Sequence, residues 1–501
     1  PIIDPVIKEL KNHLKVINSV GLNYLSLDRD ASTISGGEAQ RLRLAKALGS
    51  PLSGVCYILD EPSIGLHPQD QDRIMDTLFS LKKGGNTVIV VEHDEETIRL
   101  AEHVVDIGPK GGANGGHLVV EGTLDDLLKA KNSLTADALR KREVGVEQEL
   151  KTKKDLLGAD WISLKKATCN NLKNIDVEIP LGKITVVAGV SGAGKSSLVR
   201  GCFIPAAIDE IEENQRKDNK YWQSITGLDS IKRLIELDQT PIGKTITSTP
   251  ASYLGVFDLI RKIYASLPEA KMRGYTNSYF SFNSGKGRCL ECSGKGVIKI
   301  PMSFLPDAIT TCEACNGQRY NREALEILYQ GFSIGDILKK TIEEAADILK
   351  NHKLIKRTLD YVIELGLGYI SLGQPTYTLS GGEAQRLKIA TELGMRDAEN
   401  TIYILDEPTI GLHMSDVDKL LSVVNKLKEK GNTIIIIEHN LDVMRASDYL
   451  IEIGPGPGED GGKLLFSGAP NELAKLKTTT PTKKYLFNVK GEDERFEANS
   501  I

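Results

Sequence analysis

A glycine-rich segment from Gly189 to Ser196, with the sequence GVSGAGKS, carries the most definite chemistry in the chain. Glycines between a strand and a helix let backbone N–H groups point at phosphate oxygens, and the helix dipole favours negative charge there. The lysine would bridge the β- and γ-phosphates, and the serine after it would offer its hydroxyl to magnesium. The residues expected to bind a nucleoside triphosphate and its magnesium ion here are Gly189, Ser191, Gly192, Gly194, Lys195, Ser196 and Ser197.

Polar residues also stand at the ends of three apolar runs that predict buried strands, at 234–237, 401–405 and 433–437. Asp406 would hold the metal ion, and Glu407 beside it would polarise an attacking water. His439 would contact the γ-phosphate, and Gln239 stands where a glutamine would contact metal and water. Taken singly, Glu407 also fits a solvated strand end, His439 fits a strand cap, and an isolated glutamine is usually just exposed.

Several of these features occur twice. The sequence SGGEAQRL at 35–42 returns at 380–387, and each copy precedes an apolar run ending in Leu-Asp-Glu-Pro. The number of residues from Asp60 to Asp406 equals the number from His93 to His439. A spacing held through several motifs predicts a duplicated domain. Since only one phosphate loop is present, we expect one whole nucleotide-binding unit and the C-terminal part of another, as in a fragment or split gene product.

Two Cys-x-x-Cys pairs, Cys289 with Cys292 and Cys312 with Cys315, are separated by 19 residues and followed closely by glycines. This spacing is typical of a tetrahedral zinc site, in which each pair forms a tight turn and four thiolates fill the coordination sphere. With no open ligand position, the zinc would be structural. The remaining cysteines lack such spacing and fit buried apolar positions.

The region around the first cysteine pair is basic and holds one acid within thirty residues. Cations would neutralise DNA phosphates, and aromatic side chains would wedge against disturbed bases. The alternative is a solvated basic face on a zinc-stabilised core. The cations are Lys271, Arg273, Lys286, Arg288, Lys295 and Lys299, and the aromatics are Tyr275, Tyr279, Phe280 and Phe282.

The bulk properties are those of an ordinary globular protein of several domains. A net charge of −5 gives no global attraction to nucleic acid, so such a site must be a local patch. No apolar run approaches the ~20 residues of a membrane-spanning helix, and no signal-peptide pattern occurs. We therefore expect a cytoplasmic protein, and the reducing cytosol suits its seven cysteines.

Together, the phosphate loop, the repeated Ser-Gly-Gly segment, Leu-Asp-Glu-Pro and the histidines resemble the ABC-type ATPase family. The resemblance implies an α/β fold with parallel-sheet nucleotide-binding cores and helical signature subdomains. It also implies that ATP bound at Lys195 is covered by the first signature, at Ser35, Gly36 and Gly37. A second, incomplete site would consist of Asp60, Glu61, His93, Ser380, Gly381 and Gly382.

On this basis the chain is divided as follows: end of the first signature domain, 1–50; C-terminal half of the first ATP-binding domain, 51–130; linker, 131–158; N-terminal half of the second ATP-binding domain, 159–245; second signature domain, 246–395, with the zinc module at 285–320; C-terminal half of the second ATP-binding domain, 396–475; flexible tail, 476–501. The α/β parts alternate strands and helices, which predicts a mostly parallel sheet in each.

From residue 1 to about 475 the chain resembles the UvrA family, the damage-recognition ATPases of the bacterial excinuclease ABC. The marks are both SGGEAQR segments, Asp-Gln-Thr-Pro-Ile-Gly at 238–243, Arg-Gly-Tyr at 273–275 and the inserted zinc module. The family implies a homodimer that binds distorted double-stranded DNA, verifies lesions with ATP in nucleotide excision repair, and loads UvrB. Family members also carry an N-terminal half with the first phosphate loop and the UvrB-binding region, which this sequence does not contain.

Two other functions share some of these motifs. A UvrA-like protein that confers resistance to a DNA-binding drug would share all of them. A soluble subunit of an ABC transporter would share the nucleotide motifs, but the zinc module disfavours it. A chromosome-structuring ATPase would need long heptad runs, and the sequence has none.

Overall fold

The computed structural model describes residues 3–22, 24–30, 36–48, 53–63, 65–109, 115–143, 150–212, 221–243, 245–302, 308–394 and 399–487. The chain forms two compact units: the first contains residues 1–107, 118–238 and 399–501, and the second contains residues 108–117 and 239–398. We name residues 1–107 and 118–143 the first repeat, and residues 151–238 and 399–487 the second repeat. Within the described residues, no helix is long and apolar enough to cross a membrane.

A six-stranded sheet forms the centre of the second repeat. Its strands are β7 (Ile184–Ala188), β9 (Arg233–Leu237), β14 (Thr401–Asp406), β15 (Thr433–Ile437), β16 (Tyr449–Gly454) and β17 (Lys463–Gly468). The order is β17-β16-β7-β15-β14-β9, and only β17 runs antiparallel to its neighbour. Strands β7 and β15 are buried along their whole length, which suits their β-branched composition. The parallel α/β core predicted for this part is therefore present.

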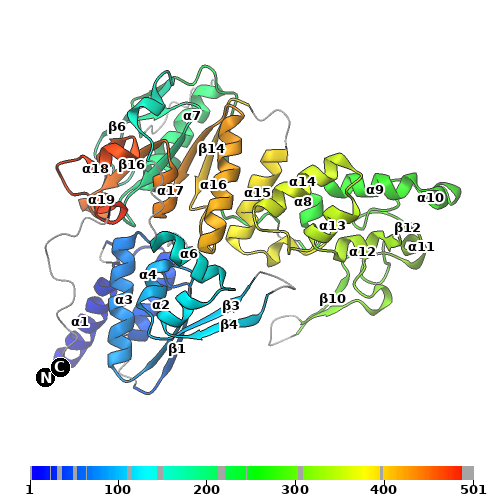
Figure 1. The fold of residues 1–501 in the computed structure, drawn as a ribbon, viewed down its shortest axis with the longest axis horizontal. Helices are drawn as coiled ribbons and strands as arrows, with labels where there is room; N and C mark the ends of the chain where they lie inside the picture. Colours follow the sequence, from blue (N-terminus) through cyan, green and yellow to red (C-terminus); the bar gives the residue numbers. More distant parts are fainter. Residues whose placement is uncertain are drawn as a thin grey trace. The chain divides into compact units, whose positions relative to one another are not determined.

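A second sheet and several helices complete the core of this repeat. The three-stranded antiparallel sheet, in the order β6-β5-β8, contains β5 (Trp161–Ala167), β6 (Ile175–Pro180) and β8 (Ser224–Thr226). The helices are α7 (Ile204–Ile211), α16 (Met414–Glu429), α17 (Leu441–Ala446), α18 (Pro470–Ala474) and α19 (Pro481–Leu486). Helices α16 and α17 lie along the six-stranded sheet (Figure 1). One apolar cluster joins the two sheets, with Ile162, Ile404 and Ile451 fully buried.

The first repeat has a smaller β-structure. Its elements are α1 (Ile3–Ser19), α2 (Gly36–Leu48), β1 (Cys56–Asp60), α3 (Pro68–Lys83), β2 (Thr87–Val91), α4 (Glu95–Leu100), β3 (Val104–Gly108), β4 (His117–Gly122), α5 (Leu124–Lys129) and α6 (Leu134–Glu143). Strands β1 and β2 are parallel, as β14 and β15 are, but β3 pairs with β4 instead of joining them. In the second repeat β7 fills this place between β15 and β16, and no described strand does so here. Alternate residues of β1 and β2 are consequently exposed, with Ile58 at 71%.

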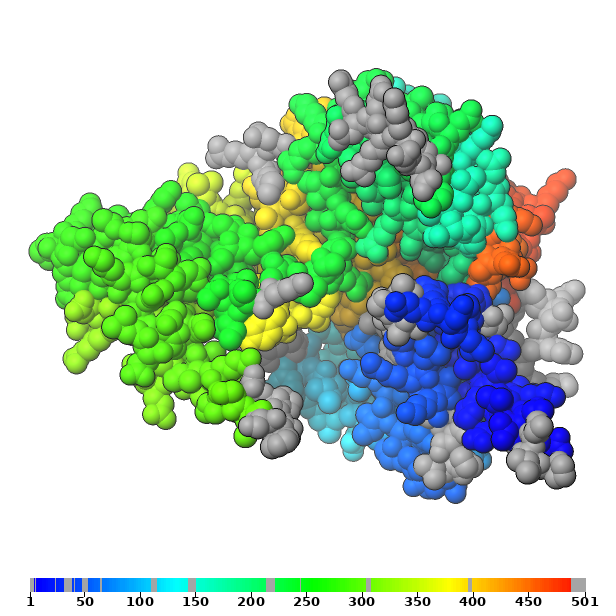
Figure 2. Space-filling model, turned by 180° about the vertical axis from the view of Figure 1, so that it is seen from behind, coloured from blue at the N-terminus to red at the C-terminus, as the bar shows by residue number. Residues whose placement is uncertain are grey.

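The second unit is mainly helical. Its elements are α8 (Pro250–Tyr253), α9 (Val256–Ser266), α10 (Pro268–Met272), β10 (Val297–Ile300), β11 (Ala308–Thr311), α11 (Arg322–Leu325), β12 (Leu328–Tyr329), β13 (Phe332–Ser333), α12 (Ile334–Lys339), α13 (Ile342–Ile348), α14 (Lys353–Glu364) and α15 (Gly381–Gly394). Residues from about 250 to 340 form one continuous lobe, green to yellow-green in Figure 2. The cysteine pairs and the hairpin β10–β11 belong to this lobe, which we name the zinc lobe.

The segment after residue 475 differs from the flexible tail predicted by the sequence. Helix α19 is packed into the first unit, with Tyr485 and Leu486 buried. The buried carboxylate of Glu452 explains the order, because it accepts hydrogen bonds from the Thr480 hydroxyl and, at 2.8 Å, from the Thr482 N–H. A buried carboxylate requires such partners. Residues 488–501 lie outside the described part.

Candidate functional site

The glycine-rich segment connects β7 to a π-helical turn over Ser197–Phe203. Its glycines are required by close packing: Gly189 has φ +141°, and a Cβ there would lie 2.1 Å from the Ile453 carbonyl oxygen. The Lys195 ammonium donates to the carbonyl oxygens of Gly189 (2.9 Å) and Val190 (3.1 Å). Burial lowers the pKa of Lys195 to about 8, although Glu407 and other nearby carboxylates oppose the shift.

Asp406 and Glu407 follow one another at the end of β14. Burial, reinforced by the neighbouring Glu407 charge, raises the pKa of Asp406 to about 6, and the Arg200 guanidinium lies 3.1 Å from this carboxylate. Burial likewise raises the pKa of Glu407. The backbone of Glu407 is left-handed, with φ +46°, a conformation that most side chains avoid and that is common at functional sites.

His439 faces Glu407 from the adjacent strand end. Its Nε2 lies 3.5 Å from Glu407 Oε1, and its Nδ1 has no hydrogen-bond partner among the described residues. The turn is held by Glu438, which accepts hydrogen bonds from the N–H groups of Thr409 (3.0 Å) and Asn440 (2.9 Å). Burial, followed by the Lys195 charge, lowers the pKa of His439 well below its usual range, so the ring is neutral.

The first repeat contains a similar histidine–glutamate pair, in which Nδ1 rather than Nε2 faces the carboxylate. His93 Nδ1 lies 3.6 Å from Glu61 Oε1, and Glu61 also has a left-handed backbone, with φ +44°. Glu92, the counterpart of Glu438, accepts a hydrogen bond from the Ser63 N–H at 2.9 Å. Asp60 ends β1, as Asp406 ends β14. The duplication seen in the sequence therefore extends to the geometry of the polar side chains.

The first repeat also reaches the phosphate loop of the second, through residues that the sequence did not single out. Asp70, on α3, accepts a hydrogen bond from the Ser191 N–H at 3.2 Å. A Cβ on Gly192 would lie 3.1 Å from the ring of Tyr24, whose hydroxyl donates to Glu38 of α2 at 2.6 Å. Asp70 lies three residues after the histidine of the repeated Ile-Gly-Leu-His segment, which was the available signal.

A glycine of the first repeat approaches Glu407 directly. Gly65 has φ +64°, and a Cβ there would lie 2.8 Å from Glu407 Oε2. The signature residues predicted to cover this site begin α2: Gly36 and Gly37 stand at its N-terminus, whereas Ser35 lies outside the described residues.

The second signature, Ser380 to Gly382, stands at the N-terminus of α15 in the second unit. The Glu383 carboxylate accepts from the Ser380 N–H at 2.8 Å and the Glu383 N–H donates back to the Ser380 hydroxyl, a reciprocal cap that fixes the helix start. Gln239 also belongs to this unit, and a Cβ on Gly381 would lie 3.2 Å from its Oε1. The structure thus places Gln239 beside the second signature.

The four cysteines of the predicted zinc site are brought together and buried. All four sulfur atoms lie within 4.8 Å of one another, with Cys289 to Cys312 at 4.0 Å and Cys292 to Cys315 at 3.7 Å. A tetrahedral ion with Zn–S bonds of about 2.3 Å separates its sulfurs by about 3.8 Å, so the donor set fits zinc. Gly294 and Gly317 have positive φ in the two turns.

The basic region is less uniform than its sequence indicates. Phe280 and Phe282 are fully buried in the core of the lobe, so the prediction that they wedge against bases is wrong. Tyr275 and Tyr279 remain partly exposed and stack at 3.8 Å, and both hydroxyls donate to Glu323.

Glu326, directly after helix α11, also brings negative charge to this region, which a count of acids along the sequence missed. Glu326 pairs with Arg273 at 2.9 Å and with Arg322 at 3.6 Å. Arg288 donates to the Asn283 carbonyl at 2.8 Å. Lys271 and Lys286 are exposed.

Two cavities in the first unit differ in whether the polar residues at the strand ends line them. One, of about 390 Å³, is lined by Glu407 and His439 from the second repeat and by Ser63 and His93 from the first. Tyr485 of α19 also lines it. This cavity is therefore continuous with the polar groups at the strand ends.

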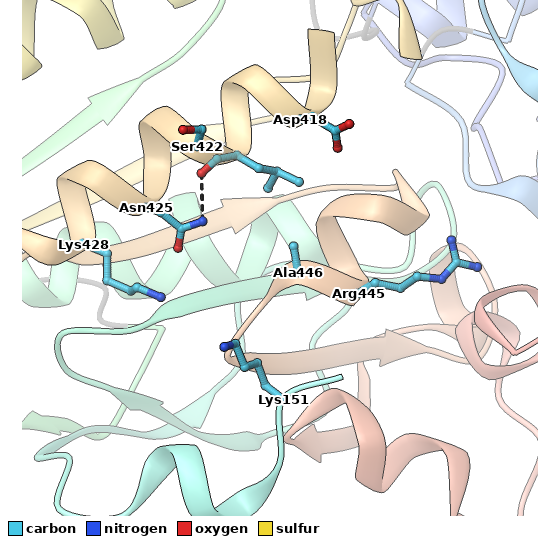
Figure 3. Close-up of a pocket in the computed structure, with 8 residues that line it drawn as sticks. Lys151, Asp418, Ser422, Asn425, Lys428, Arg445 and Ala446 are labelled. Carbon is cyan, nitrogen blue, oxygen red and sulfur yellow. Dashed lines mark hydrogen bonds between the residues drawn. The ribbon is translucent and has the colours of Figure 1, made fainter. Parts of the chain in front are cut away.

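The other cavity, of about 420 Å³, lies beside α16 and α17 and contains Lys151, Lys428 and Arg445 (Figure 3). Two of these cations are already paired, Lys428 with Asp448 at 3.1 Å and Arg445 with Asp442 at 3.3 Å. No residue of the phosphate loop lines it, so its size does not make it the nucleotide site.

No family model matches the chain. UvrABC system protein A of Staphylococcus aureus (strain COL) is 49% identical over 495 residues, which are 99% of this chain and 52% of that protein. The protein of the same name from Haemophilus influenzae is 47% identical over 97% of this chain and 51% of its own length. The crystal structure of UvrA2 from Deinococcus radiodurans matches with a TM-score of 0.87 and 45% identity, over 95% of this chain and 57% of that one.

The chain thus spans about half the length of the curated relatives it matches. Its α/β fold with a parallel sheet is that of the ABC-type ATPases, as the resemblance implied. Over nearly its whole length the chain is homologous to the C-terminal half of UvrABC system protein A.

Proposed function

We propose that this chain is an ATPase that binds ATP at the phosphate loop around Lys195 and hydrolyses it with Glu407 as the group that polarises water. The observation that carries the proposal is the convergence of Lys195, Glu407 and His439 in one buried site. Lys195 would hold the β- and γ-phosphates, and the neutral His439 would contact the γ-phosphate. Gln239 would contact metal and water when ATP is bound.

Magnesium fits this site because the donors are hard oxygen atoms and because negative charge is concentrated there. The pKa of Asp406 is raised because its carboxylate is buried beside Glu407, and the nearby charges of Arg200 and Lys195 do not fully compensate. Asp406 and the Ser196 hydroxyl would hold the ion, with Ser197 and the loop N–H groups beside it. Magnesium would neutralise the charge that develops on the phosphates.

The site would be composite, because the first repeat already reaches it. The contacts of Asp70 and Tyr24 with the phosphate loop support closure by the first signature, Ser35 to Gly37. The second site, with Asp60, Glu61 and His93, would pair with the signature Ser380 to Gly382. It would need a strand and phosphate loop equivalent to β7 and its loop, on the side of β2 away from β1, where no described strand pairs with it.

The biological role we propose is recognition of damaged double-stranded DNA in nucleotide excision repair. The name UvrABC system protein A, carried by relatives 49% identical, supports it. DNA would lie along the exposed cations of the zinc lobe, with zinc bound by the four cysteines. UvrB as a partner, a homodimer of the longer protein and a cytoplasmic location also follow from this relationship.

The test measures ATP turnover by the purified chain with no DNA, with intact duplex and with a duplex carrying one bulky lesion. Lys195→Ala is the variant that should bind no ATP. We expect turnover in the parent that lesion-bearing DNA changes more than intact DNA does. Turnover that Lys195→Ala retains would refute the ATP site, and equal responses to both duplexes would refute damage recognition.

A further inference from the structure

His67, in the repeated Ile-Gly-Leu-His segment of the first repeat, is fully buried beside the nucleotide site. Its Nδ1 accepts a hydrogen bond from the Gln69 N–H at 3.2 Å, so in the neutral ring the proton is on Nε2. That Nε2 has no hydrogen-bond partner among the described residues. The ring is therefore held on this side by packing alone.

Two aromatic rings provide that packing. His439 of the second repeat lies 6.0 Å from His67 between ring centroids, and Tyr485 of α19 lies 5.7 Å away. Both contacts are edge-to-face, at 77° and 88°, an arrangement favoured between aromatic rings. His67 is thus in contact with both Tyr485 and the histidine that faces Glu407.

Helix α19 is fixed to both repeats, which makes Tyr485 a rigid support. Its hydroxyl donates to Asp72 of α3 in the first repeat at 2.7 Å. On the other side, the Leu486 carbonyl accepts from Arg445 of α17 at 3.1 Å, and Glu452 of β16 anchors the N-terminus of the helix. The C-terminal segment therefore ties the first repeat to the strand ends of the second.

The duplicated copy is fixed differently. His413, the counterpart of His67, also accepts from the N–H two residues on, that of Ser415, at 3.2 Å. Its Nε2, however, lies 3.1 Å from the Thr135 hydroxyl, which in turn bonds Asp106. A hydrogen bond thus fixes the ring of His413, whereas packing against Tyr485 and His439 fixes the ring of His67.

We infer that Tyr485 is a positioning residue for ATP hydrolysis: through His67 it sets the place of His439 against Glu407. Tyr485 itself lines the cavity that contains Glu407 and His439. This inference rests on the proposed function. It concerns turnover rather than nucleotide binding, because Tyr485 packs against His67, whereas the Lys195 ammonium is held by the Gly189 and Val190 carbonyl oxygens.

The first measurement is steady-state ATP hydrolysis by the parent, Tyr485→Ala, Tyr485→Phe and the control Tyr221→Phe. Tyr221 is 47% exposed in the same unit. We expect Tyr485→Ala to lower kcat about tenfold with an unchanged KM, because displacement of a reacting group affects the chemical step. Tyr485→Phe keeps the ring and should restore most of kcat, and Tyr221→Phe should equal the parent.

The second measurement follows the imidazole NMR signals of the eight histidines and needs no turnover. His67 and His439 are assigned by their loss in His67→Asn and His439→Asn. Tyr485→Ala should shift both signals and leave that of His413 in place. If it unfolds the chain, Tyr485→Leu, which keeps apolar volume, replaces it.

A His439 signal that stays unmoved in Tyr485→Ala overturns the inference, whether or not the parent hydrolyses ATP. A kcat of Tyr485→Ala equal to that of the parent also overturns the inference. A loss of kcat that Tyr485→Phe shares does the same. A parent without turnover contradicts the proposed function instead, and the shift of the His439 signal then still decides whether Tyr485 positions that ring.

Discussion

The Nε2 atom of His439 lies 3.5 Å from Oε1 of Glu407. In the duplicated pair, Nδ1 of His93 lies 3.6 Å from Oε1 of Glu61. In both pairs the glutamate has a left-handed backbone, φ +46° and φ +44°. The pairs differ in burial: the His439 side chain is 6% exposed and that of His93 is 27% exposed. Burial, followed by the Lys195 charge, accordingly lowers the pKa of His439 well below its usual range.

Glu407→Gln should leave ATP binding unchanged and lower turnover at least a hundredfold, because the amide cannot accept a proton from water. The matched control is Glu61→Gln, which changes the same position of the repeat that lacks a phosphate loop. Binding is measured with a fluorescent ATP analogue, and turnover by phosphate release. Equal losses of turnover in the two variants would contradict the proposal that hydrolysis takes place at the site built on Lys195.

ATP affinity should depend on pH through Lys195. Because burial lowers its pKa to about 8, the ammonium is lost on raising the pH from 7 to 9, and affinity should fall by up to about tenfold. Folding stability should change in the opposite direction: above pH 8 and up to the unfolded value of 10.5, the unfolded chain holds more protons, so stability rises with pH.

The control for this titration is Lys195→Arg, whose guanidinium stays charged throughout. Its affinity should be lower than that of the parent but flat between pH 7 and 9. If the ATP affinity of the parent is also constant between pH 7 and 9, Lys195 keeps its charge in the free protein.

Asp70→Asn should bind ATP several-fold more tightly. The Asp70 carboxylate occupies the Ser191 N–H and adds negative charge near the place expected for the phosphates. Removing one charge at such a site changes affinity by about 1 kcal/mol in a partly polar environment. Isothermal titration compares Asp70→Asn with Asp76→Asn, which changes an exposed carboxylate further along the same helix α3. Weaker binding in Asp70→Asn would instead make the carboxylate part of the closed site.

Much of this architecture could be predicted from the sequence, and the misses share a physical cause. Strand β15 has the predicted bounds, because a continuous β-branched run leaves few alternatives. Helix α19 was missed because its order depends on Glu452, which no local pattern reveals. Glu326 was missed for the same reason, since it approaches Arg273 only through the fold of the zinc lobe.

Cys312→Ser should release the zinc ion and disorder the two turns, because ligand binding and local folding are coupled. Nucleotide binding should persist, since Lys195 belongs to the other unit. Metal analysis and proteolysis of the variant compare it with Cys56→Ser, which alters an exposed cysteine outside the cluster. Full zinc content in Cys312→Ser would remove this cysteine from the ligand set.

DNA affinity should depend on Lys271 more than on Arg273, because Glu326 already neutralises Arg273. Lys271→Ala should weaken binding at every salt concentration and flatten the slope of log affinity against log salt by about one unit. Glu326→Gln should have the opposite effect, since it frees Arg273 for phosphate contact. The control, Lys350→Ala, removes an exposed lysine that pairs with Asp347, and it should match the parent. Salt titrations with one duplex decide: if Glu326→Gln leaves affinity unchanged while Lys271→Ala also matches the parent, the DNA surface lies elsewhere and this region is a solvated basic face.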